Sequence, residues 1–209
     1  MNLKFLLSKI LKIYLNPPAL KNCKLSQNSK VCSKSELLNT TLDDYSYIGY
    51  NCFVAETKIG KYCSIADNCR IGGAAHPLNW VTTSPVFHNN KNVLKTNFGH
   101  LPYEPFSKTI IENDVWLGAN VLIKSGIKIS NGAVIGMGSV VTHDVGPYEI
   151  WAGNPAKLIR KRFSEENIEK LLKIEWWNLS ENRLRNLSDK ISDVEKFIKE
   201  IENENFTYR

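Results

Sequence analysis

Residues 111–141 read IENDVWLGANVLIKSGIKISNGAVIGMGSVV, and aliphatic side chains recur along this stretch at one fixed interval. Successive members of the series stand six residues apart: Ile111, Leu117, Ile123, Ile129, Ile135 and Val141. An α-helix repeats after about 3.6 residues and a strand after about 2, so neither explains the interval. The spacing is typical of a hexapeptide β-solenoid, in which short strands turn a corner after each hexapeptide and stack.

Two further rows of residues keep this register. Three positions after each of the first five aliphatics stand residues that tolerate the left-handed backbone of a tight corner: Asp114, Asn120, Gly126, Gly132 and Gly138. One position later stand small or aliphatic residues that can point inward: Val115, Val121, Ile127, Ala133 and Ser139. A first block with the same rhythm, broken by two five-residue steps, runs from about Leu25 to Ile71. Together the blocks predict about four to five coils of about 18 residues each.

A stretch without this rhythm, residues 73–109, separates the two blocks and contains three of the four histidines. Because long irregular segments inside a compact domain are often functional, we interpret it as an inserted active-site loop. The sequence therefore predicts an all-β solenoid over residues 21–162, interrupted by this loop. An amphipathic helix is expected over residues 1–20 and a helical extension over residues 163–209, where Ser164 and two following glutamates mark a helix start. We expect this tail to cover an end of the solenoid.

The composition narrows the function classes. The 209 residues carry a net charge of +6 and are 43% hydrophobic, which suits a globular domain. Lys and Arg are scattered rather than gathered in a stripe, so the charge suits a nucleotide cofactor, and nucleic acid is not an expected partner. The five cysteines form no CxxC pair. Cys52, Cys63 and Cys69 fall on the inward small-residue position, so we expect buried thiols in a reducing, cytoplasmic compartment.

The N-terminal segment, residues 1–15, is apolar but interrupted by three lysines, so neither a signal peptide nor a membrane span is expected. Leu3, Leu6, Ile10 and Ile13 share one face of a helix. We expect that face to dock on the body of the protein or on a partner subunit. A peripheral contact with a lipid surface is the less favoured alternative.

Six short stretches resemble the xenobiotic acetyltransferase branch of the hexapeptide-repeat acyltransferases, which contains chloramphenicol and streptogramin acetyltransferases and many sugar O-acetyltransferases. They are Tyr45-Ser46-Tyr47, IGKYCSI at 59–65, IGGAAH at 71–76, IENDVWLG at 111–118, AGNPAK at 152–157 and IEWWN at 174–178. The resemblance covers most of residues 40–180. It implies a left-handed parallel β-helix, a homotrimer and acetyl-CoA as the acyl donor, with no metal ion.

The same resemblance marks His76 as the catalytic residue, at the point where a hexapeptide gives way to the loop. A neutral imidazole can take the proton of an acceptor hydroxyl while the oxygen attacks the acetyl thioester. Its second ring nitrogen then needs a carboxylate or backbone carbonyl as partner, and the oxyanion needs a donor such as a backbone N–H. A surface or structural histidine is the alternative. A metal site of His76, His88 and His100 is conceivable, but spacings of 12 residues match no usual ligand pair.

Five residues are candidates for binding the acceptor: Tyr47, Trp80, Thr83, Ser84 and Phe87. Aromatic rings beside hydroxyls suit a sugar, which has both apolar faces and OH groups. The alternative is that Trp80 and Phe87 simply anchor the loop. From residue 76 to 87 the loop reads HPLNWVTTSPVF, a form that resembles the sugar-directed members more than the antibiotic-modifying ones.

For coenzyme A, the resemblance implies a groove beside the C-terminal coils. Its candidate residues are Trp116, Gly118, Gly136, Ser139, Asn154, Lys157 and Arg160. The tryptophan would pack on the pantetheine arm, backbone groups near the glycines and the serine would bond its amides, and the polar residues would meet the nucleotide. The alternatives are a tryptophan lid over the solenoid, glycines that only form corners, and a solvated lysine.

The resemblance and the loop together predict an acetyl-CoA-dependent O-acetyltransferase acting on a sugar or polysaccharide-precursor hydroxyl, with His76 as general base. The acceptor is then a small molecule or carbohydrate. Acetylation of an antibiotic such as chloramphenicol or a streptogramin is the alternative. A non-catalytic solenoid that organises partner proteins is the third hypothesis.

Overall fold

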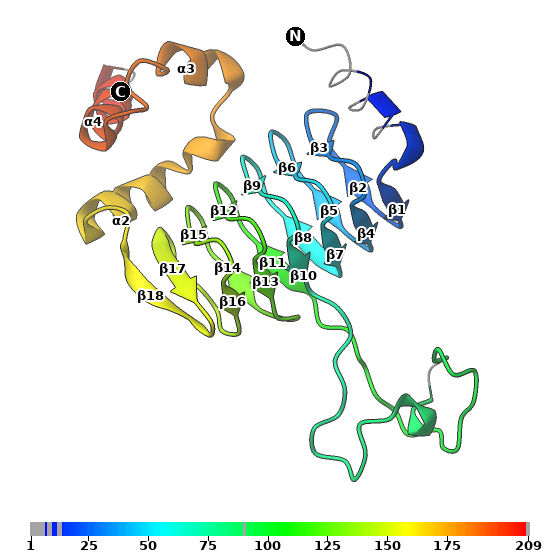
Figure 1. Cartoon of the computed structure of the whole chain (residues 1–209). Coiled ribbons are helices and arrows are strands. Elements are labelled where there is room, and N and C mark those ends of the chain that lie inside the picture. The colour runs from blue at the N-terminus through cyan, green and yellow to red at the C-terminus, as the bar shows by residue number, and fades with distance from the viewer. Residues whose placement is uncertain (1–6, 8–9, 12–13, 90, 208–209) are drawn as a thin grey trace.

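The computed structural model describes residues 7, 10–11, 14–89 and 91–207. Its centre is a triangular prism whose three sides are sheets of short strands, called sheets A, B and C (Figure 1). Sheet A contains β1 (Ala19–Lys21), β4 (Glu36–Leu38), β7 (Phe53–Ala55), β10 (Arg70–Ile71), β13 (Leu122–Ile123) and β16 (Val140–Val141). Sheet B contains β2 (Lys24–Leu25), β5 (Thr41–Leu42), β8 (Thr57–Ile59), β11 (Thr109–Ile111) and β14 (Lys128–Ile129). Sheet C contains β3 (Lys30–Val31), β6 (Tyr47–Ile48), β9 (Ser64–Ile65), β12 (Trp116–Leu117), β15 (Val134–Ile135), β17 (Glu149–Gly153) and β18 (Ala156–Lys161).

The chain visits the three sheets in turn, and neighbouring coils pair in parallel register. The exception is the terminal hairpin, in which β17 and β18 are antiparallel. This architecture confirms the predicted left-handed parallel β-helix with an inserted loop and a helical tail.

The coils differ in length along the prism. On sheet A, Glu36 pairs with Phe53 and Phe53 with Arg70, so these coils take 17 residues. Nearer the C-terminus Leu122 pairs with Val140, and the coil takes 18. The shorter coils have one five-residue side, which explains the irregular steps in the sequence. Sheet A has six strands, more than the four to five coils expected, because the repeat begins earlier, at β1.

The hexapeptide aliphatics fill the interior of the prism. Ile111, Leu117, Ile129, Ile135 and Val141 are at most 1% exposed. Burial of one such side chain contributes about 1.5–3 kcal/mol, so the row supplies much of the stability of the fold. The inward position one residue past each corner holds the three predicted thiols, which are buried: Cys52, Cys63 and Cys69.

The corners carry the left-handed backbone that the sequence predicts. At the corner between sheets C and A, Asn51 and Asn68 both have positive φ angles, and Asn51 Nδ2 donates to Asn68 Oδ1 at 2.8 Å. At the corner between sheets A and B, Gly72 has φ +72°. An added Cβ there would lie 2.2 Å from the carbonyl oxygen of Ala55, so the position requires glycine. The chain leaves the prism directly after this residue.

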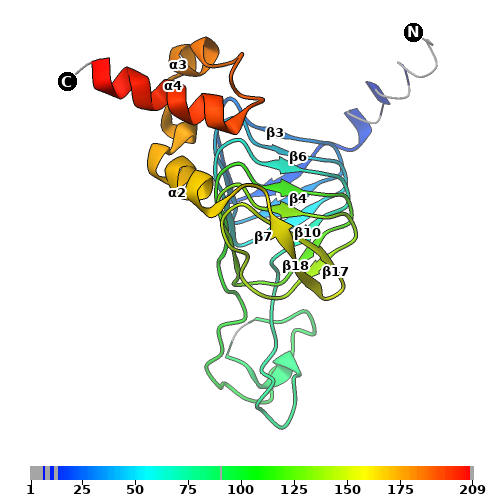
Figure 2. The ribbon, with the colours of Figure 1, turned by 90° about the vertical axis from the view of Figure 1, so that its left-hand side faces the viewer.

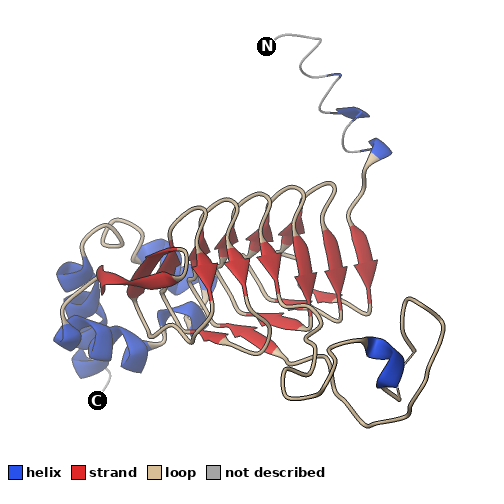
Figure 3. Cartoon of the chain, turned by 60° about the horizontal axis from the view of Figure 1, so that its bottom comes forward, coloured by secondary structure: helices blue, strands red, loops and turns tan. Residues whose placement is uncertain are grey.

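The inserted segment, residues 73–108, forms an arm that projects away from the prism (Figures 1 and 3). Its two ends pair with each other: Ala74 forms an antiparallel bridge with Phe106, and Ala75 N donates to Pro105 O at 2.7 Å. Farther out lies the short helix η1 (Pro85–Phe87). The arm is therefore a closed excursion with a paired stem, and the solenoid continues in register on either side of it.

The tail consists of α2 (Glu165–Ile174), η2 (Trp176–Asn178), α3 (Glu181–Asn186) and α4 (Val194–Thr207). Ser164 caps α2, as predicted, because its side chain accepts a backbone hydrogen bond in the first turn. The tail lies beside the prism along the corner between sheets B and C (Figure 2). There Tyr62 packs on Trp176 with ring centroids 4.9 Å apart, and the Tyr45 hydroxyl donates to Glu181. The expectation that the tail covers an end of the solenoid is wrong, because these corner tyrosines offer it an aromatic strip along the side.

Half of the expected N-terminal amphipathic helix, residues 1–20, lies outside the described part of the chain, including Leu3, Leu6 and Ile13, and at its far end Ala19 and Leu20 belong to strand β1 instead. Five described residues before Asn16 are helical and exposed: Leu7, Ile10, Leu11, Tyr14 and Leu15. They do not pack on the prism of the same chain. Among the described residues, no helix has the length and apolar character needed to cross a bilayer.

Candidate active site

His76 lies on the arm, just beyond its paired stem, and is exposed. Its Nδ1 atom is 2.8 Å from the backbone carbonyl oxygen of Thr83. A carbonyl oxygen can only accept a hydrogen bond, so Nδ1 carries the hydrogen and Nε2 keeps its lone pair. The carbonyl is one of the two kinds of partner expected for this ring. The arrangement leaves Nε2 available to accept a proton.

His76 borders a cleft of about 460 Å³ within the arm, which is lined by the stem on one side and by Pro85 and residues 91–93 of the outer arm on the other. Part of its wall is apolar, from Ala74, Pro105 and Phe106. His88 and Glu104 add polar groups to the same wall. An apolar cleft with a few polar groups is the usual form of a small-molecule site. The sequence did not single out Glu104, which the structure places in the cleft wall two residues before Phe106, the stem residue bridged to Ala74.

The predicted acceptor residues of the loop mainly build the arm. The Trp80 ring meets His88 edge-on with centroids 5.3 Å apart, and the Phe87 ring packs on Phe98 at 5.9 Å. Neither aromatic residue lines the cleft with His76, nor do Thr83 and Ser84. The contribution of Thr83 is its carbonyl group. This placement supports the alternative in which the two aromatic rings anchor the loop.

Tyr47, the remaining acceptor candidate, lies on sheet C and is exposed. It occupies the outward row of that sheet together with Trp116, two coils farther along. The arm leaves from the corner between sheets A and B, so a single chain does not bring Tyr47 to the His76 cleft.

Several of the predicted cofactor residues do come together, at the corner between sheets C and A. Gly118 and Gly136 occupy equivalent corner positions in successive coils, and each backbone N–H donates to the following coil at 2.8 Å. Trp116, 54% exposed, lies on sheet C beside them. Ser139 is buried, and its hydroxyl donates to Gly136 O at 2.6 Å and accepts from Gly153 N at 3.1 Å. Its side chain is therefore committed to the interior and unable to meet a cofactor.

The β17–β18 hairpin extends the same edge. Its turn contains a cis peptide bond between Asn154 and Pro155, and Asn154 is exposed there. Lys157 lies opposite Ala152, the residue that stacks on Gly136. Arg160 is also exposed and donates to the Lys161 carbonyl at 2.9 Å. The structure thus gathers the backbone groups, Asn154 and Lys157 at this edge, whereas Arg160, opposite Ile150, lies farther from it on sheet C.

The two halves of the predicted site lie on opposite edges of sheet A. The glycine corner precedes β13 and β16, whereas the arm with His76 follows β10 on the far side of the sheet. A single chain therefore separates the predicted base from the predicted donor groove by the width of one face of the prism.

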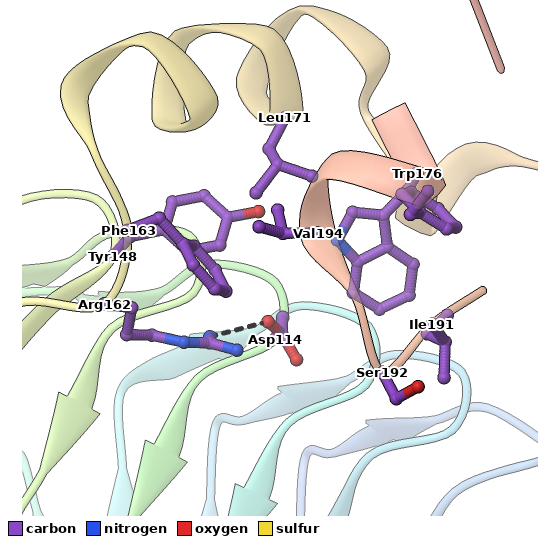
Figure 4. A pocket seen from close by; sticks show the side chains of 10 residues that line it. Asp114, Tyr148, Arg162, Phe163, Leu171, Trp176, Ile191, Ser192 and Val194 are labelled. Carbon is purple, nitrogen blue, oxygen red and sulfur yellow. Dashed lines mark hydrogen bonds and ion pairs between the residues drawn. The ribbon is translucent and has the colours of Figure 1, made fainter. Parts of the chain in front are cut away.

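A second cavity, of about 230 Å³, lies between the tail and the prism (Figure 4). On its floor Arg162 Nη1 donates to Asp114 Oδ2 at 2.9 Å and to Gly132 O at 2.8 Å. Burial raises the pKa of Asp114, and Arg162 opposes the rise. Burial also raises the pKa of Tyr148 to about 12. The lining contains no histidine or cysteine, and its contacts join the tail to the prism.

Among the described residues, no group of three or more His, Cys, Asp or Glu side chains is placed to hold a metal ion. The conceivable site of His76, His88 and His100 is therefore not assembled. His88 instead packs inside the arm between Trp80 and Tyr103.

Comparison with known proteins adds three findings on sequence. Residues 108–143 match the family model described as hexapeptide repeat of succinyl-transferase. The chain is 44% identical over 126 residues to a Lysinibacillus sphaericus protein named a probable macrolide acetyltransferase, covering 58% of this chain and 69% of that protein. It is 40% identical over 130 residues to a chloramphenicol acetyltransferase of Klebsiella aerogenes, covering 61% of each. The match thus spans 69% of the first relative and 61% of the second.

Among solved structures, the chain is similar to a variant of AntD, an N-acyltransferase from Bacillus cereus in complex with dTDP-4-amino-4,6-dideoxyglucose and coenzyme A. The TM-score is 0.52 at 20% identity, and the match covers 82% of this chain and 97% of that one. At this level of identity the similarity concerns the fold.

Proposed function

Since the chain belongs to the hexapeptide-repeat acetyltransferases, the family of its macrolide and chloramphenicol acetyltransferase relatives, we propose that it moves an acetyl group from acetyl-CoA to an acceptor hydroxyl. His76 is the general base in this proposal. The hydrogen bond between His76 Nδ1 and the Thr83 carbonyl, which leaves Nε2 with its lone pair at the cleft, is the observation that carries it. Family membership makes a purely scaffolding solenoid the weakest of the three hypotheses.

The chemistry needs one proton to move twice. Nε2 of His76 takes the proton of the acceptor hydroxyl as its oxygen forms a bond to the thioester carbonyl carbon. When the tetrahedral intermediate collapses, the carbon–sulfur bond breaks and the thiolate takes the proton back from the imidazolium. The products are an acetyl ester and the free thiol of coenzyme A. The Thr83 carbonyl holds the imidazolium through Nδ1–H while the charge exists.

The donor groove in this proposal is the corner with Gly118 and Gly136, where coenzyme A brings its thioester to the base. Because His76 lies across sheet A from that corner, a second copy of the chain supplies the missing half of each site. A homotrimer satisfies this requirement, since a threefold axis gives three equivalent sites. The arm supports such an assembly, because it leaves large apolar side chains exposed: Leu78, Val81, Val93, Leu94 and Phe98.

The acceptor in this proposal is a sugar or polysaccharide-precursor hydroxyl. Its support is the sugar-directed form of the loop and a cleft with polar groups set among apolar walls. An antibiotic is the second candidate, because two relatives at 44% and 40% identity are named macrolide and chloramphenicol acetyltransferases.

A direct assay tests both candidates. The protein is incubated with acetyl-CoA and, separately, with methyl glycosides of glucose, galactose and mannose, with chloramphenicol and with a macrolide. Thiol release and product mass are followed. We expect turnover that depends on a glycoside. Turnover with the antibiotics alone would replace the sugar acceptor, and absence of any acetylated product would end the proposal.

A further inference from the structure

We propose that Glu104 is the residue that selects the acceptor, by accepting a hydrogen bond from a second hydroxyl group next to the one that reacts. This inference rests on the proposed function and narrows its substrate class to acceptors with at least two neighbouring hydroxyls. A sugar ring has this form, whereas a simple alcohol does not.

The stem of the arm sets Glu104 against His76. Ala74 is bridged to Phe106 in antiparallel register, and Ala75 N donates to Pro105 O. Continued by one residue, this antiparallel register places His76 and Glu104 opposite each other. Both border the same cleft. The register of the stem thus sets a carboxylate opposite the proposed base.

One oxygen of the Glu104 carboxylate accepts a backbone hydrogen bond, and the other is available to a ligand. Its Oε1 atom accepts a hydrogen bond from the Phe106 backbone N–H at 3.3 Å, which orients the group. The side chain forms no ion pair with any residue that the structure describes, and it is exposed to the cleft. Oε2 is consequently available as an acceptor. A hydrogen bond from a hydroxyl to an ionised carboxylate is stronger than one between neutral groups.

The rest of the cleft fits a ligand with several polar groups. His88 is 4% exposed, and its Nε2 atom is buried without a hydrogen-bond partner. Its ring packs between Trp80 and Tyr103 and forms part of the cleft wall. Apolar surface from Pro105 and Phe106 lies beside these groups and suits a sugar face. A polyhydroxylated acceptor satisfies every one of these features.

The test uses paired substrates and paired variants. The wild-type protein, Glu104→Ala and Glu104→Gln are assayed with acetyl-CoA and the preferred methyl glycoside, and with each of its monodeoxy analogues. Glu169→Gln, which removes an exposed carboxylate of α2 far from the cleft, is the matched control. Thermal unfolding of each variant is recorded alongside the kinetics.

We expect the acceptor KM to rise about 10- to 100-fold in Glu104→Ala while the KM for acetyl-CoA stays unchanged, because a charge-assisted hydrogen bond is lost. One analogue lacking a non-reacting hydroxyl should lose a similar factor in kcat/KM with the wild type and no further factor with Glu104→Ala. Glu104→Gln should fall between, because an amide oxygen still accepts a hydrogen bond.

The outcomes separate this inference from the proposed function. Equal kinetics of the wild type and His76→Ala, or no acetylation of any acceptor, would overturn both. Loss of activity in His76→Ala together with an unchanged acceptor KM in both Glu104 variants would overturn the role of Glu104 alone. The same conclusion would follow if the wild type accepted all monodeoxy analogues equally, a result that needs no variant to fold.

Discussion

The Nδ1 atom of His76 lies 2.8 Å from the backbone carbonyl oxygen of Thr83, within one arm of the chain. Histidines that act as bases are often oriented by a carboxylate, which a substitution can remove. A carbonyl belongs to the backbone, so the orientation of this imidazole depends on the conformation of the arm. The arrangement fixes the tautomer and adds no second charge beside the ring.

The tautomer can be observed directly. In its neutral form, His76 should carry its hydrogen on Nδ1, because the Thr83 carbonyl can only accept. Long-range ¹H–¹⁵N correlation spectra of the folded protein report which ring nitrogen is protonated, and His76→Ala identifies the signals. A spectrum with the hydrogen on Nε2 would contradict the proposed base.

Removal of the imidazole should abolish most of the activity. We expect His76→Ala to lower kcat by roughly 100-fold or more, the size expected for loss of a general base. Because the ring is exposed, thermal unfolding should be unchanged. His143→Ala removes another exposed imidazole outside the arm and should retain full activity. A rate in His76→Ala within a few-fold of the wild type would remove the residue from the mechanism.

The ion pair below the tail should make stability depend on pH. Burial raises the pKa of Asp114, so between the ordinary Asp value of about 3.9 and the raised one the folded state binds more protons than the unfolded state. Its contribution to stability therefore falls as pH rises through that window, and Arg162 limits the loss. We expect Arg162→Met to cost about 2–3 kcal/mol of unfolding free energy at pH 7 and less near pH 4.

Urea denaturation at several pH values measures this effect. The double variant Asp114→Asn with Arg162→Met removes the titrating group and should lose the extra pH dependence. Asparagine is a suitable replacement because position 114 has φ +57°, which asparagine tolerates. An equal cost of Arg162→Met at both pH values would contradict the role of the buried carboxylate.

The interior thiols should be unreactive while the protein is folded. Burial raises the pKa of the Cys63 thiol to about 12, so near pH 8 almost none is thiolate. In a variant with Cys23→Ser and Cys32→Ser, the partly exposed thiols are gone and the remaining three are buried: Cys52, Cys63 and Cys69. A hydrogen bond from Cys69 lowers the pKa of the Cys52 thiol, but all three side chains are buried, so an aromatic disulfide reagent should label none of them rapidly before urea is added and all of them afterwards. Fast labelling of the folded variant would contradict the packing of the prism.

Substitution of two corner glycines can distinguish the cost of backbone strain from the cost of a steric clash. Gly72 and Gly138 have nearly the same φ, +72° and +71°. An added Cβ meets the Ala55 carbonyl oxygen at 2.2 Å in the first case and nothing within 4 Å in the second. We expect Gly138→Ala to cost about 1 kcal/mol and Gly72→Ala about 3 kcal/mol or more, measured by urea denaturation. Equal losses of unfolding free energy in the two variants would mean that backbone strain alone determines the effect.

The hexapeptide repeat could be predicted from the sequence because the same burial requirement recurs in every coil. Each side of the prism must bury one aliphatic residue, and Ile111 through Val141 satisfy that demand at a constant step. The first coils were harder to count, because a five-residue side shifts the register: Leu37 stands twelve residues after Leu25, but Leu42 follows Leu37 by only five. The sequence did not predict where the C-terminal helices pack. It depends on contacts such as that of Tyr62 with Trp176, which join residues far apart in sequence.

The candidate site was predictable only where the residues are neighbours in sequence. His76 stands at the end of a hexapeptide, so its place at the base of a loop followed directly. Its partner could not be named, because a backbone carbonyl leaves no trace in the residue types. Glu104 was missed for a similar reason, since it enters the cleft wall beside His76 only when Ala74 and Phe106 join the two ends of a long loop. The roles predicted for His76 and for the coenzyme A residues stay predictions.

Because its stem is paired, the arm can be replaced as a unit without changing the solenoid. Ala74 and Phe106 close it on themselves, and the rungs on either side stack as though the insertion were absent. Evolution can therefore lengthen, shorten or replace what lies beyond the stem without disturbing the hydrophobic ladder. Relatives with a common scaffold can in this way diverge in the molecules they modify, and grafting a foreign arm between these two residues is a practical route to a new specificity.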